Sequence, residues 1–497
     1  MLNLKLNKEA IFLNWQSIFL LGTFIILRVL SFFIRTNDIL QTTIIFSLFI
    51  TMGVFFFKNP TYAFMLLLTE LFLGGSGNLF SFFGLSIRTT LILVFMFLWI
   101  CYALYHKNLR LLYIPHKFFY VLPLIMILTF FSFTNALLHQ HNFADIIKDL
   151  IPYTYFILFL PAYHLFNKQK LQEYFIRLIG VYVIGSALFS LFTFVLFVSR
   201  ISLIQGAYYK WYRDIVNGKI TFITDFFYRI VTPEHLLIPL IMIIIVALLM
   251  RQEKHNHWWR LMFVLLAITL ILNFSRAYFL GFFVGMAFLI YKHNIKKWLF
   301  VSIWSIAILS ITFTSINFIA SQGRSFGLEI AGVRIGSLIK PMSETSSYTR
   351  TMLLEPIFKQ IKEAPLLGHG IGSSITYYNS LSHDYTTTTQ YDWGYFEMLA
   401  ELGVIGTLVY LFIIAILIIE IIKKIRLVNN YHDIYVGLLG SIIALLVINI
   451  TTPVLFHVIG ILFITLVMTF MAQPLTTFDN IVLTLYKIFN KMKKTIT

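Results

Sequence analysis

The stretch GYFEMLAELGVIGTLVYLFIIAILIIEI (394–421) decides the class of fold. Its apolar run is long enough to cross the hydrocarbon core of a bilayer, which needs about 20 apolar residues in a helix. The rest of the chain is similar, because 59% of its residues are hydrophobic, 12% are charged and the mean hydropathy is +0.84. A soluble domain has roughly half apolar and about a quarter charged residues. The composition therefore predicts an all-α, polytopic integral membrane protein.

Measured against the thickness of a bilayer, the sequence predicts about fourteen transmembrane helices. A single cysteine, Cys101, falls inside the fourth of them, so an intrachain disulfide is excluded and a buried thiol is expected. Lys5 and Lys8 precede the first span, and no small-residue cleavage site follows it, so this span is expected to be uncleaved. The expected spans are 13–34, 39–57, 61–83, 86–105, 118–137, 147–166, 174–199, 235–250, 257–275, 276–291, 298–320, 394–421, 432–451 and 454–471.

The distribution of basic residues predicts the orientation of these spans. The net charge is +17, and lysine and arginine are concentrated in every second short loop, which is the positive-inside pattern. Both termini are thus expected in the cytoplasm, and the basic excess indicates topology and not a nucleic-acid partner. The expected segments are N-terminal helices (1–199), an extracytoplasmic loop (200–234), further helices (235–320), a long extracytoplasmic loop (321–393), C-terminal helices (394–471) and a cytoplasmic amphipathic tail (472–497).

An amphipathic helix is expected within the long polar segment 321–393, from the cap at Ser346-Ser347 to about Glu363. Arg350 lies on the same face as the apolar residues of this helix. An arginine on a buried face usually has an anionic partner, since an unpaired buried charge is costly. A structural ion pair, or a side chain that extends to the membrane surface, would explain the same pattern.

Two further arginines lie at the predicted outer face. Arg276 ends the motif N-F-S-R between two spans, and Arg229 precedes a span in Y-R-I-V-T-P-E-H. Together with Arg350 they suggest capture of a phosphate or pyrophosphate, which guanidinium groups bind bidentately. No D-x-D or E-x-D motif is present. We therefore expect arginines, and not a metal ion, to bind the pyrophosphate, and we expect no cofactor. Arg28, in the first span, is expected to be an ordinary interfacial anchor.

The end of the long polar segment carries the other candidate site residues. The motif G-H-G-I-G (368–372) follows a helix, whereas a dinucleotide-binding site would need a preceding strand. We therefore expect a turn here, and an anion-binding nest of backbone N–H groups is the alternative. Asp392, just before the twelfth span, is either catalytic or favourable at a helix start. Four aromatic candidates could stack on a carbohydrate or simply anchor the interface: Tyr377, Tyr378, Tyr391 and Trp393. His369 is a candidate substrate contact or an ordinary loop residue, and Glu397 could support the site or simply form an ion pair.

Three of these motifs together resemble the O-antigen ligase/polymerase superfamily, most densely over 229–410. They are S-R at a span end, an arginine-bearing helix before P-L-L-G-x-G-x-G, and a polar residue eleven positions ahead of G-x-x-G. The resemblance implies a GT-C-like glycosyltransferase of the bacterial cytoplasmic (inner) membrane, metal-independent and inverting, with its active site outside the cytoplasm. It also implies that Arg276 and Arg350 bind the diphosphate of undecaprenyl-diphosphate-linked oligosaccharide repeat units.

The residue pair Asp392-Trp393 bears on the kind of transfer. Ligases of the family have a histidine followed by Asn, Ser or Gln at this position, whereas polymerases vary there, so the resemblance favours a Wzy-type polymerase of O-antigen or capsule repeat units. Arg229 would assist, and a chain-length regulator protein is a candidate further partner. An O-antigen ligase and a flippase or other transporter of lipid-linked oligosaccharides are the alternatives.

Overall fold

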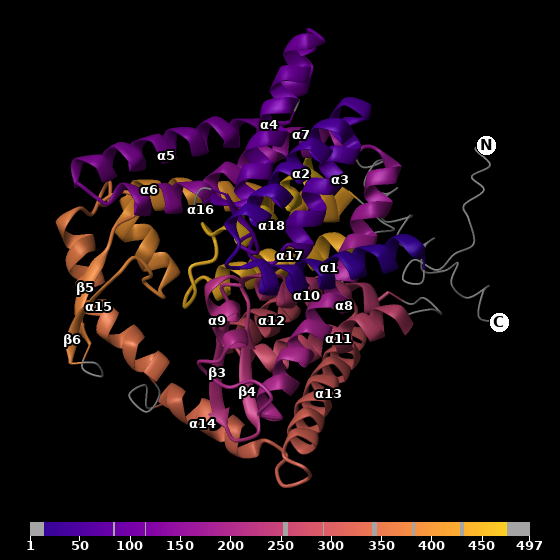
Figure 1. Cartoon of the computed structure of the whole chain (residues 1–497), viewed down its shortest axis with the longest axis vertical. Helices are drawn as coiled ribbons and strands as arrows, with labels where there is room; N and C mark the ends of the chain where they lie inside the picture. Colours follow the sequence, from indigo (N-terminus) through magenta and orange to yellow (C-terminus); the bar gives the residue numbers. More distant parts are fainter. Residues whose placement is uncertain are drawn as a thin grey trace.

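The computed structural model describes residues 14–82, 85–114, 116–251, 257–291, 293–339, 345–379, 383–427 and 432–474. Helices dominate the described chain, and the few strands form short hairpins (Figure 1). Lys5, Lys8 and nearly all of the expected tail 472–497 lie outside the described residues. The structure therefore has the all-α, polytopic character that the composition predicts.

Every expected span coincides with helix over most of its length. The helices of the N-terminal part are α1 (Trp15–Ile34), α2 (Asp38–Lys58), α3 (Pro60–Leu73), α4 (Ile87–Tyr105), α5 (Val121–Leu138), α6 (Phe143–Leu150), α7 (Phe159–Leu165) and α8 (Gln169–Val198). Short 3-10 helices η1 (Leu109–Leu112), η2 (Lys117–Tyr120) and η3 (Ile151–Leu158) lie among them. Helix α3 ends ten residues before the expected position 83, because Gly74 caps it.

The second half of the chain continues in the same way. Its helices are α9 (Ala207–Asp214), η4 (Pro233–Leu236), α10 (Leu237–Leu249), α11 (His257–Asn273), α12 (Arg276–Phe288), α13 (Ile295–Ala320), α14 (Leu328–Ile339), α15 (Thr345–Glu363), α16 (Gly394–Leu427), α17 (His432–Ile448) and α18 (Val458–Ala472). The amphipathic helix expected near Ser346–Glu363 is confirmed as α15. Helices α9 and α14 were not expected, because they lie in segments whose polarity predicts loops.

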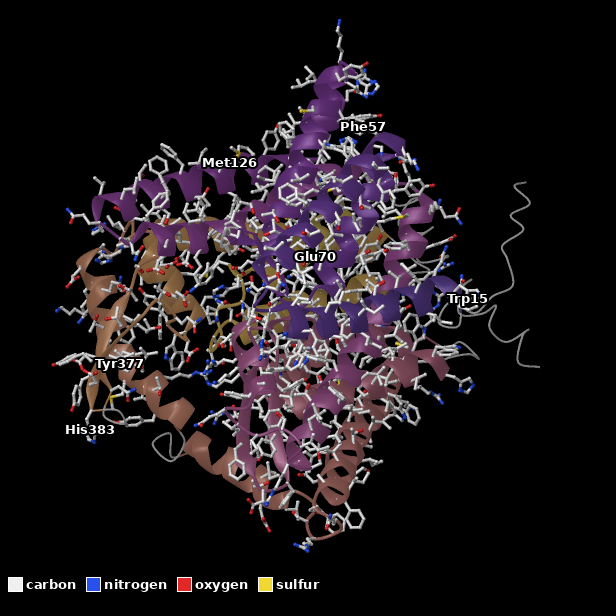
Figure 2. All side chains as sticks on the ribbon, in the orientation of Figure 1. Trp15, Phe57, Glu70, Met126, Tyr377 and His383 are labelled. Atoms are coloured by element: carbon white, nitrogen blue, oxygen red, sulfur yellow. The ribbon has the colours of Figure 1, made fainter. Side chains whose placement is uncertain are left out.

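Apolar side chains cover much of the outside of the protein. Among the described residues, seven helices are long and apolar enough to cross a membrane, and only 22% of the apolar window of α2 is buried. Phe57 and Met126 lie at the periphery in Figure 2 and are mostly exposed. Lipid is the medium that such a surface requires. The expectation of a buried Cys101 is wrong, because its side chain is exposed on the outward side of α4.

Helices α10 and α17 are mostly buried, and they pack against one another and against α12. Glycines bring two of these backbones together. A Cβ atom at Gly285 of α12 would lie 2.6 Å from the Gly440 carbonyl oxygen of α17, and one at Gly440 would lie 2.7 Å from the Gly285 oxygen. Close contact through small residues is how transmembrane helices gain packing energy. Helix α12, which begins at Arg276, is thereby held against the core.

The described residues also form three antiparallel hairpins, which the sequence did not reveal. They are β1 (Ser81–Phe82) with β2 (Leu85–Ser86), β3 (Lys219–Thr224) with β4 (Phe227–Val231), and β5 (Ile375–Asn379) with β6 (Asp384–Thr388). The second and third lie in the two segments predicted to be extracytoplasmic. Pairing satisfies the backbone groups of these polar segments without a helix, but strands of five or six residues carry too short a pattern to predict.

A second, smaller core lies outside the main one. Its buried members are Leu353, Ile357, Ile375, Tyr391 and Ala400. It joins α15, the hairpin β5–β6 and the first turns of α16, which lie together at one edge of the molecule in Figure 1. Leu353 and Ile357 belong to the apolar stripe expected from the sequence. This small core holds α15, the helix that carries Arg350, against the start of α16.

Candidate functional site

Arg350 and Asp392 form an ion pair between α15 and the residue preceding α16. The Arg350 Nε atom lies 3.8 Å from Asp392 Oδ2. The arginine side chain is 25% exposed and the carboxylate 45%, so the pair lies at a surface that a solute can reach. A guanidinium group can bind an anionic leaving group, and a carboxylate can accept a hydrogen bond from an attacking hydroxyl. The two groups that the sequence singled out in this segment are therefore adjacent.

Local backbone structure holds this pair in place. The indole Nε1 of Trp393 donates a hydrogen bond of 3.0 Å to the Arg350 carbonyl oxygen. Asp392 itself adopts a left-handed backbone conformation with φ of 56°. Aspartate tolerates this conformation better than most residues. It turns the chain sharply just before α16 begins, so Trp393 reaches across to α15.

A buried hydrogen-bond network lies beside the pair. Tyr391 OH donates to Gln360 Oε1 at 2.8 Å, and lies 2.6 Å from Ser373 Oγ. Burial raises the pKa of the Tyr391 phenol far above its ordinary value, so the ring stays neutral at physiological pH. Tyr391 is fully buried and therefore supports the small core; it does not offer a face to a ligand.

The hairpin β5–β6 presents the other tyrosines. Tyr378 and Tyr385 contact edge to face with ring centroids 5.4 Å apart, and both are exposed. Tyr377 is half-buried and packs against the small core. Figure 2 shows Tyr377 and the nearby His383 at the lower left edge of the molecule. Of the tyrosines proposed from the sequence, Tyr378 is thus the most accessible to a carbohydrate.

The G-H-G-I-G run is a turn, as the sequence predicts. All three glycines have positive φ, and the chain passes so close to the backbone of α5 at Gly370 that a Cβ atom would overlap Ala136. Its amide groups donate to protein acceptors: Gly370 N to Glu401 O at 2.9 Å and Gly372 N to Asp149 Oδ2 at 3.1 Å. These donors are therefore occupied, which excludes the alternative of an anion-binding nest.

His369 belongs to the same turn but not to the Arg350 pair. Its Nε2 lies 3.6 Å from Glu363 Oε2, and its ring centroid lies 4.8 Å from that of His139. Burial, followed by the nearby His139, lowers the pKa of His369. It is consequently a neutral imidazole at pH 7 that fastens the end of α15 to the turn.

Carboxylates lie behind Asp392 on the buried face of α16. Glu397 and Glu401 are 4% and 2% exposed, and Asp149 of α6 is close enough to interact electrostatically with both. One oxygen of each glutamate has no hydrogen-bond partner among the described residues. Buried acidic groups of this kind are costly and are typical of functional sites. Glu397 was expected from the sequence, whereas Asp149 was missed because it precedes Glu397 by 248 positions in the chain.

The second group of candidates lies around the end of α11. Arg229 on β4 donates from Nε to the Asn273 carbonyl oxygen at 2.7 Å, and Asn273 belongs to the same N-F-S-R motif as Arg276. The Asn273 side chain lies 3.0 Å from Nδ1 of His235, and Nε2 of His235 lies 3.2 Å from Ser190 Oγ. Buried polar side chains therefore position the segment that leads into Arg276 and α12.

Arg28 also belongs to this polar network, and its expected role as an interfacial anchor is wrong. It is 4% exposed, and its Nη2 lies 3.2 Å from Glu234 Oε1. Nη1 donates to the Leu73 carbonyl at 2.9 Å, and the guanidinium lies 3.5 Å from the centroid of the Phe24 ring. A second buried pair, Arg88 with Glu70, lies nearby, and Figure 2 shows Glu70 among the central helices.

The structure thus places the sequence-predicted residues in two groups. Arg350, Asp392 and Trp393 lie at the edge formed by α15 and α16, whereas Arg229 and Arg276 lie at β4 and α12, closer to the centre of Figure 1.

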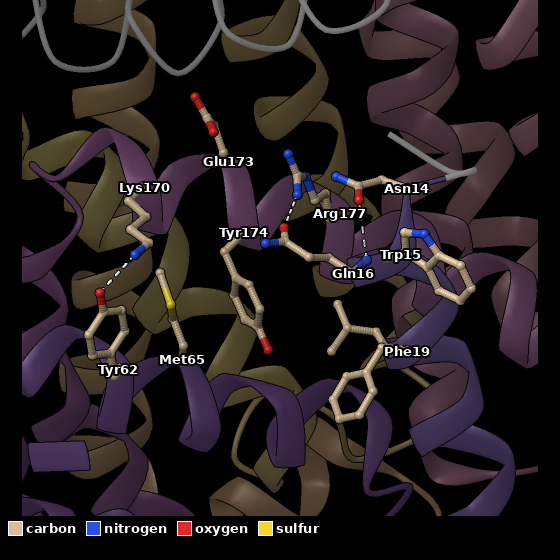
Figure 3. Close-up of a pocket in the computed structure, with 11 residues that line it drawn as sticks. Asn14, Trp15, Gln16, Phe19, Tyr62, Met65, Lys170, Glu173, Tyr174 and Arg177 are labelled. Carbon is tan, nitrogen blue, oxygen red and sulfur yellow. Dashed lines mark hydrogen bonds between the residues drawn. The ribbon is translucent and has the colours of Figure 1, made fainter. Parts of the chain in front are cut away.

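A cavity of about 870 Å³ lies between α1, α3 and α8 (Figure 3). Its polar end carries Lys170, which donates to Tyr62 OH at 2.8 Å, and Arg177, which hydrogen-bonds Gln16. None of the residues proposed from the sequence lines it. The basic loops predict this end of the helices to be cytoplasmic, so the cavity does not belong to the candidate site.

Part of the chain matches a known protein family. Residues 261–411 match the family model described as O-antigen ligase. The matched range contains Arg276, Arg350, His369 and Asp392, and ends within α16. The match supports the O-antigen ligase/polymerase superfamily and a glycosyltransferase-like activity on lipid-linked glycans. No curated protein matches the chain.

Proposed function

We propose that this protein is a polysaccharide polymerase. It would transfer the growing glycan from undecaprenyl diphosphate to a hydroxyl group of another lipid-linked repeat unit, on the extracytoplasmic face of the bacterial inner membrane. The observation that carries the proposal is the Arg350–Asp392 pair, at 3.8 Å, inside the range that matches the O-antigen ligase family.

The proposed reaction assigns a role to each charged group. The acceptor hydroxyl oxygen forms a bond with the anomeric carbon, with inversion, while the bond from that carbon to the diphosphate oxygen breaks. Arg350 and Arg276, assisted by Arg229, stabilise the negative charge on the departing undecaprenyl diphosphate, and this assignment requires α15 to approach α12 when the substrate binds. Asp392 accepts a hydrogen bond from the acceptor hydroxyl and takes its proton, a contribution of about 10²–10⁴-fold in rate.

The Asp-Trp pair favours a polymerase over a ligase. Resemblance to ligases would place a histidine at position 392, and the chain has an aspartate there, followed by Trp393, whose indole hydrogen-bonds the Arg350 carbonyl. The ligase remains the second candidate, because the matching family model carries that description. The same match supports a transferase over a flippase or other transporter.

A deletion strain distinguishes the three functions. Loss of a polymerase leaves single repeat units on the lipid carrier, and loss of a ligase leaves long lipid-linked polymers. Loss of a flippase retains the lipid-linked units on the cytoplasmic leaflet. Mass spectrometry of the carrier-bound glycan, with and without a plasmid copy of the gene, measures its length, and labelling of intact spheroplasts with a membrane-impermeant reagent shows which leaflet holds it. Long lipid-linked polymers would contradict the polymerase.

The complemented strain also tests the arginines. We expect Arg350→Ala and Arg276→Ala to shorten or abolish the polymer, because the leaving diphosphate loses a counter-charge. Arg213→Ala is the matched control, since Arg213 is an exposed arginine on α9 paired with Asp214. Unchanged polymer length in both site variants, at equal protein level, would show that these arginines do not bind the diphosphate.

A further inference from the structure

A cluster of metal-ligating side chains lies at the end of α12 opposite Arg276, outside the candidate site. His293 follows α12, and His432 and Asp433 open α17. The Nε2 atoms of His293 and His432 lie 2.9 and 3.5 Å from Asp433 Oδ1. The ligand atoms all lie within 4.8 Å of one another. His293 and Asp433 are almost fully buried, whereas His432 is partly exposed.

The hydrogen bond on the far side of His293 determines which nitrogen carries the proton. Nδ1 lies 2.7 Å from the Leu289 carbonyl oxygen, which can only accept, so Nδ1 is the N–H donor. In the neutral ring Nε2 therefore has a lone pair, and this lone pair faces a carboxylate oxygen at 2.9 Å. Two acceptors do not approach so closely unless a proton or a metal ion lies between them.

The spacing suits a metal ion. Zinc binds imidazole nitrogen at about 2.0–2.1 Å and carboxylate oxygen at about 2.0–2.2 Å, so tetrahedral ligand atoms are separated by about 3.4 Å. The observed separations of 2.9 and 3.5 Å lie on either side of that value. A ligating histidine usually donates its other N–H to a carbonyl or carboxylate, as His293 does to Leu289.

We propose that His293, His432 and Asp433 form a binding site for a divalent transition metal of the zinc class. Two imidazoles and one carboxylate are ligands that such metals prefer, and Mg²⁺ and Ca²⁺ prefer oxygen ligands only. The ion connects the end of α12 to the start of α17. Because α12 begins at Arg276, the ion fixes the far end of the helix that carries a candidate site residue. The proposal does not depend on the proposed function.

The test is zinc binding by the purified full-length chain in detergent. After treatment with a chelator and reloading with Zn²⁺, we expect about one zinc per chain to remain through gel filtration, and a higher Tm with Zn²⁺ than with Mg²⁺. His293→Ala and Asp433→Asn should bind zinc at least about ten-fold more weakly.

His116→Ala is the matched control. His116 also lies beside a carboxylate, Glu420, at 3.8 Å, but Lys117 and Lys423 already pair with that carboxylate. This variant should keep its zinc. Cobalt loading of the unmodified protein provides a second measurement that needs no variant, because a tetrahedral Co²⁺ site absorbs in the visible range. Absence of bound zinc and of this absorption would show that a proton, in a His293–Asp433 ion pair, lies between the two side chains.

Discussion

At the scale of single residues, Asp392 is the group whose chemistry matters most to the proposal. It lies 3.8 Å from Arg350 and is half-exposed before α16. We expect Asp392→Asn to lower the rate of polymerisation by about 10²–10⁴-fold, because an amide accepts a hydrogen bond but takes no proton. The rate is measured with purified protein and lipid-linked repeat units.

The control for this substitution is Asp384→Asn, since Asp384 is an exposed acid on β6, away from the arginine. It should leave the rate unchanged. Full activity of Asp392→Asn would show that Asp392 is not catalytic and only favours the start of α16.

Gly403 is a second residue with a specific structural requirement. Its backbone, with φ 65° and ψ −174°, is in a region that only glycine adopts readily, and a Cβ atom there would overlap the Leu366 carbonyl. We expect Gly403→Ala to destabilise the protein by at least about 1–3 kcal/mol, seen as a lower Tm in detergent. Gly53→Ala on α2 should not lower Tm, because no atom lies within 4 Å of the added Cβ. Equal Tm values for both variants would contradict the backbone argument.

At the scale of elements, the buried Arg28–Glu234 pair connects α1 to η4, next to the strand that carries Arg229. Removing one partner leaves an uncompensated buried charge, so Arg28→Ala should cost about 3–5 kcal/mol. The double substitution Arg28→Met with Glu234→Gln should recover much of this loss, because it leaves no charge. Thermal unfolding of the three proteins in detergent compares them.

The exposed pair Arg213–Asp214 is the control for the buried one. Arg213→Ala should leave the Tm almost unchanged, because solvent screens the charges of an exposed ion pair. If Arg28→Ala were no more destabilising than Arg213→Ala, water would have to reach Arg28 in the folded protein, and its burial would be wrong.

At the scale of the whole molecule, the positive-inside pattern predicts that the Arg350–Asp392 pair faces away from the cytoplasm. Cys101 is the only cysteine, so Cys101→Ser provides a background for single cysteines. In spheroplasts, a membrane-impermeant maleimide should label Tyr385→Cys on the exposed hairpin β5–β6. It should label Asn108→Cys, between α4 and η1, only after permeabilisation. The opposite result would place the candidate site in the cytoplasm and contradict a lipid-linked substrate outside it.

Much of the fold follows from local sequence. Runs of apolar residues predicted the positions of the spans, and the apolar stripe from Leu353 onward predicted α15, because hydrophobic periodicity is a local property. The end of α3 was misplaced, since Gly74 acts as a cap that a hydropathy window does not detect. The hairpins β3–β4 and β5–β6 were missed because short strands in polar loops leave little pattern.

The sequence by itself determined that this is a helical membrane protein with arginines and an acid near its polar segments. Only the tertiary structure decided which of these residues meet. Arg28 and Glu234 are 206 positions apart, and Gly372 and Asp149 are 223 apart. Such pairs depend on how the helices pack. The hydrophobicity of a helix does not specify which other helices become its neighbours. The separation of Arg350 and Asp392 from Arg229 and Arg276 is therefore a property of the packed molecule.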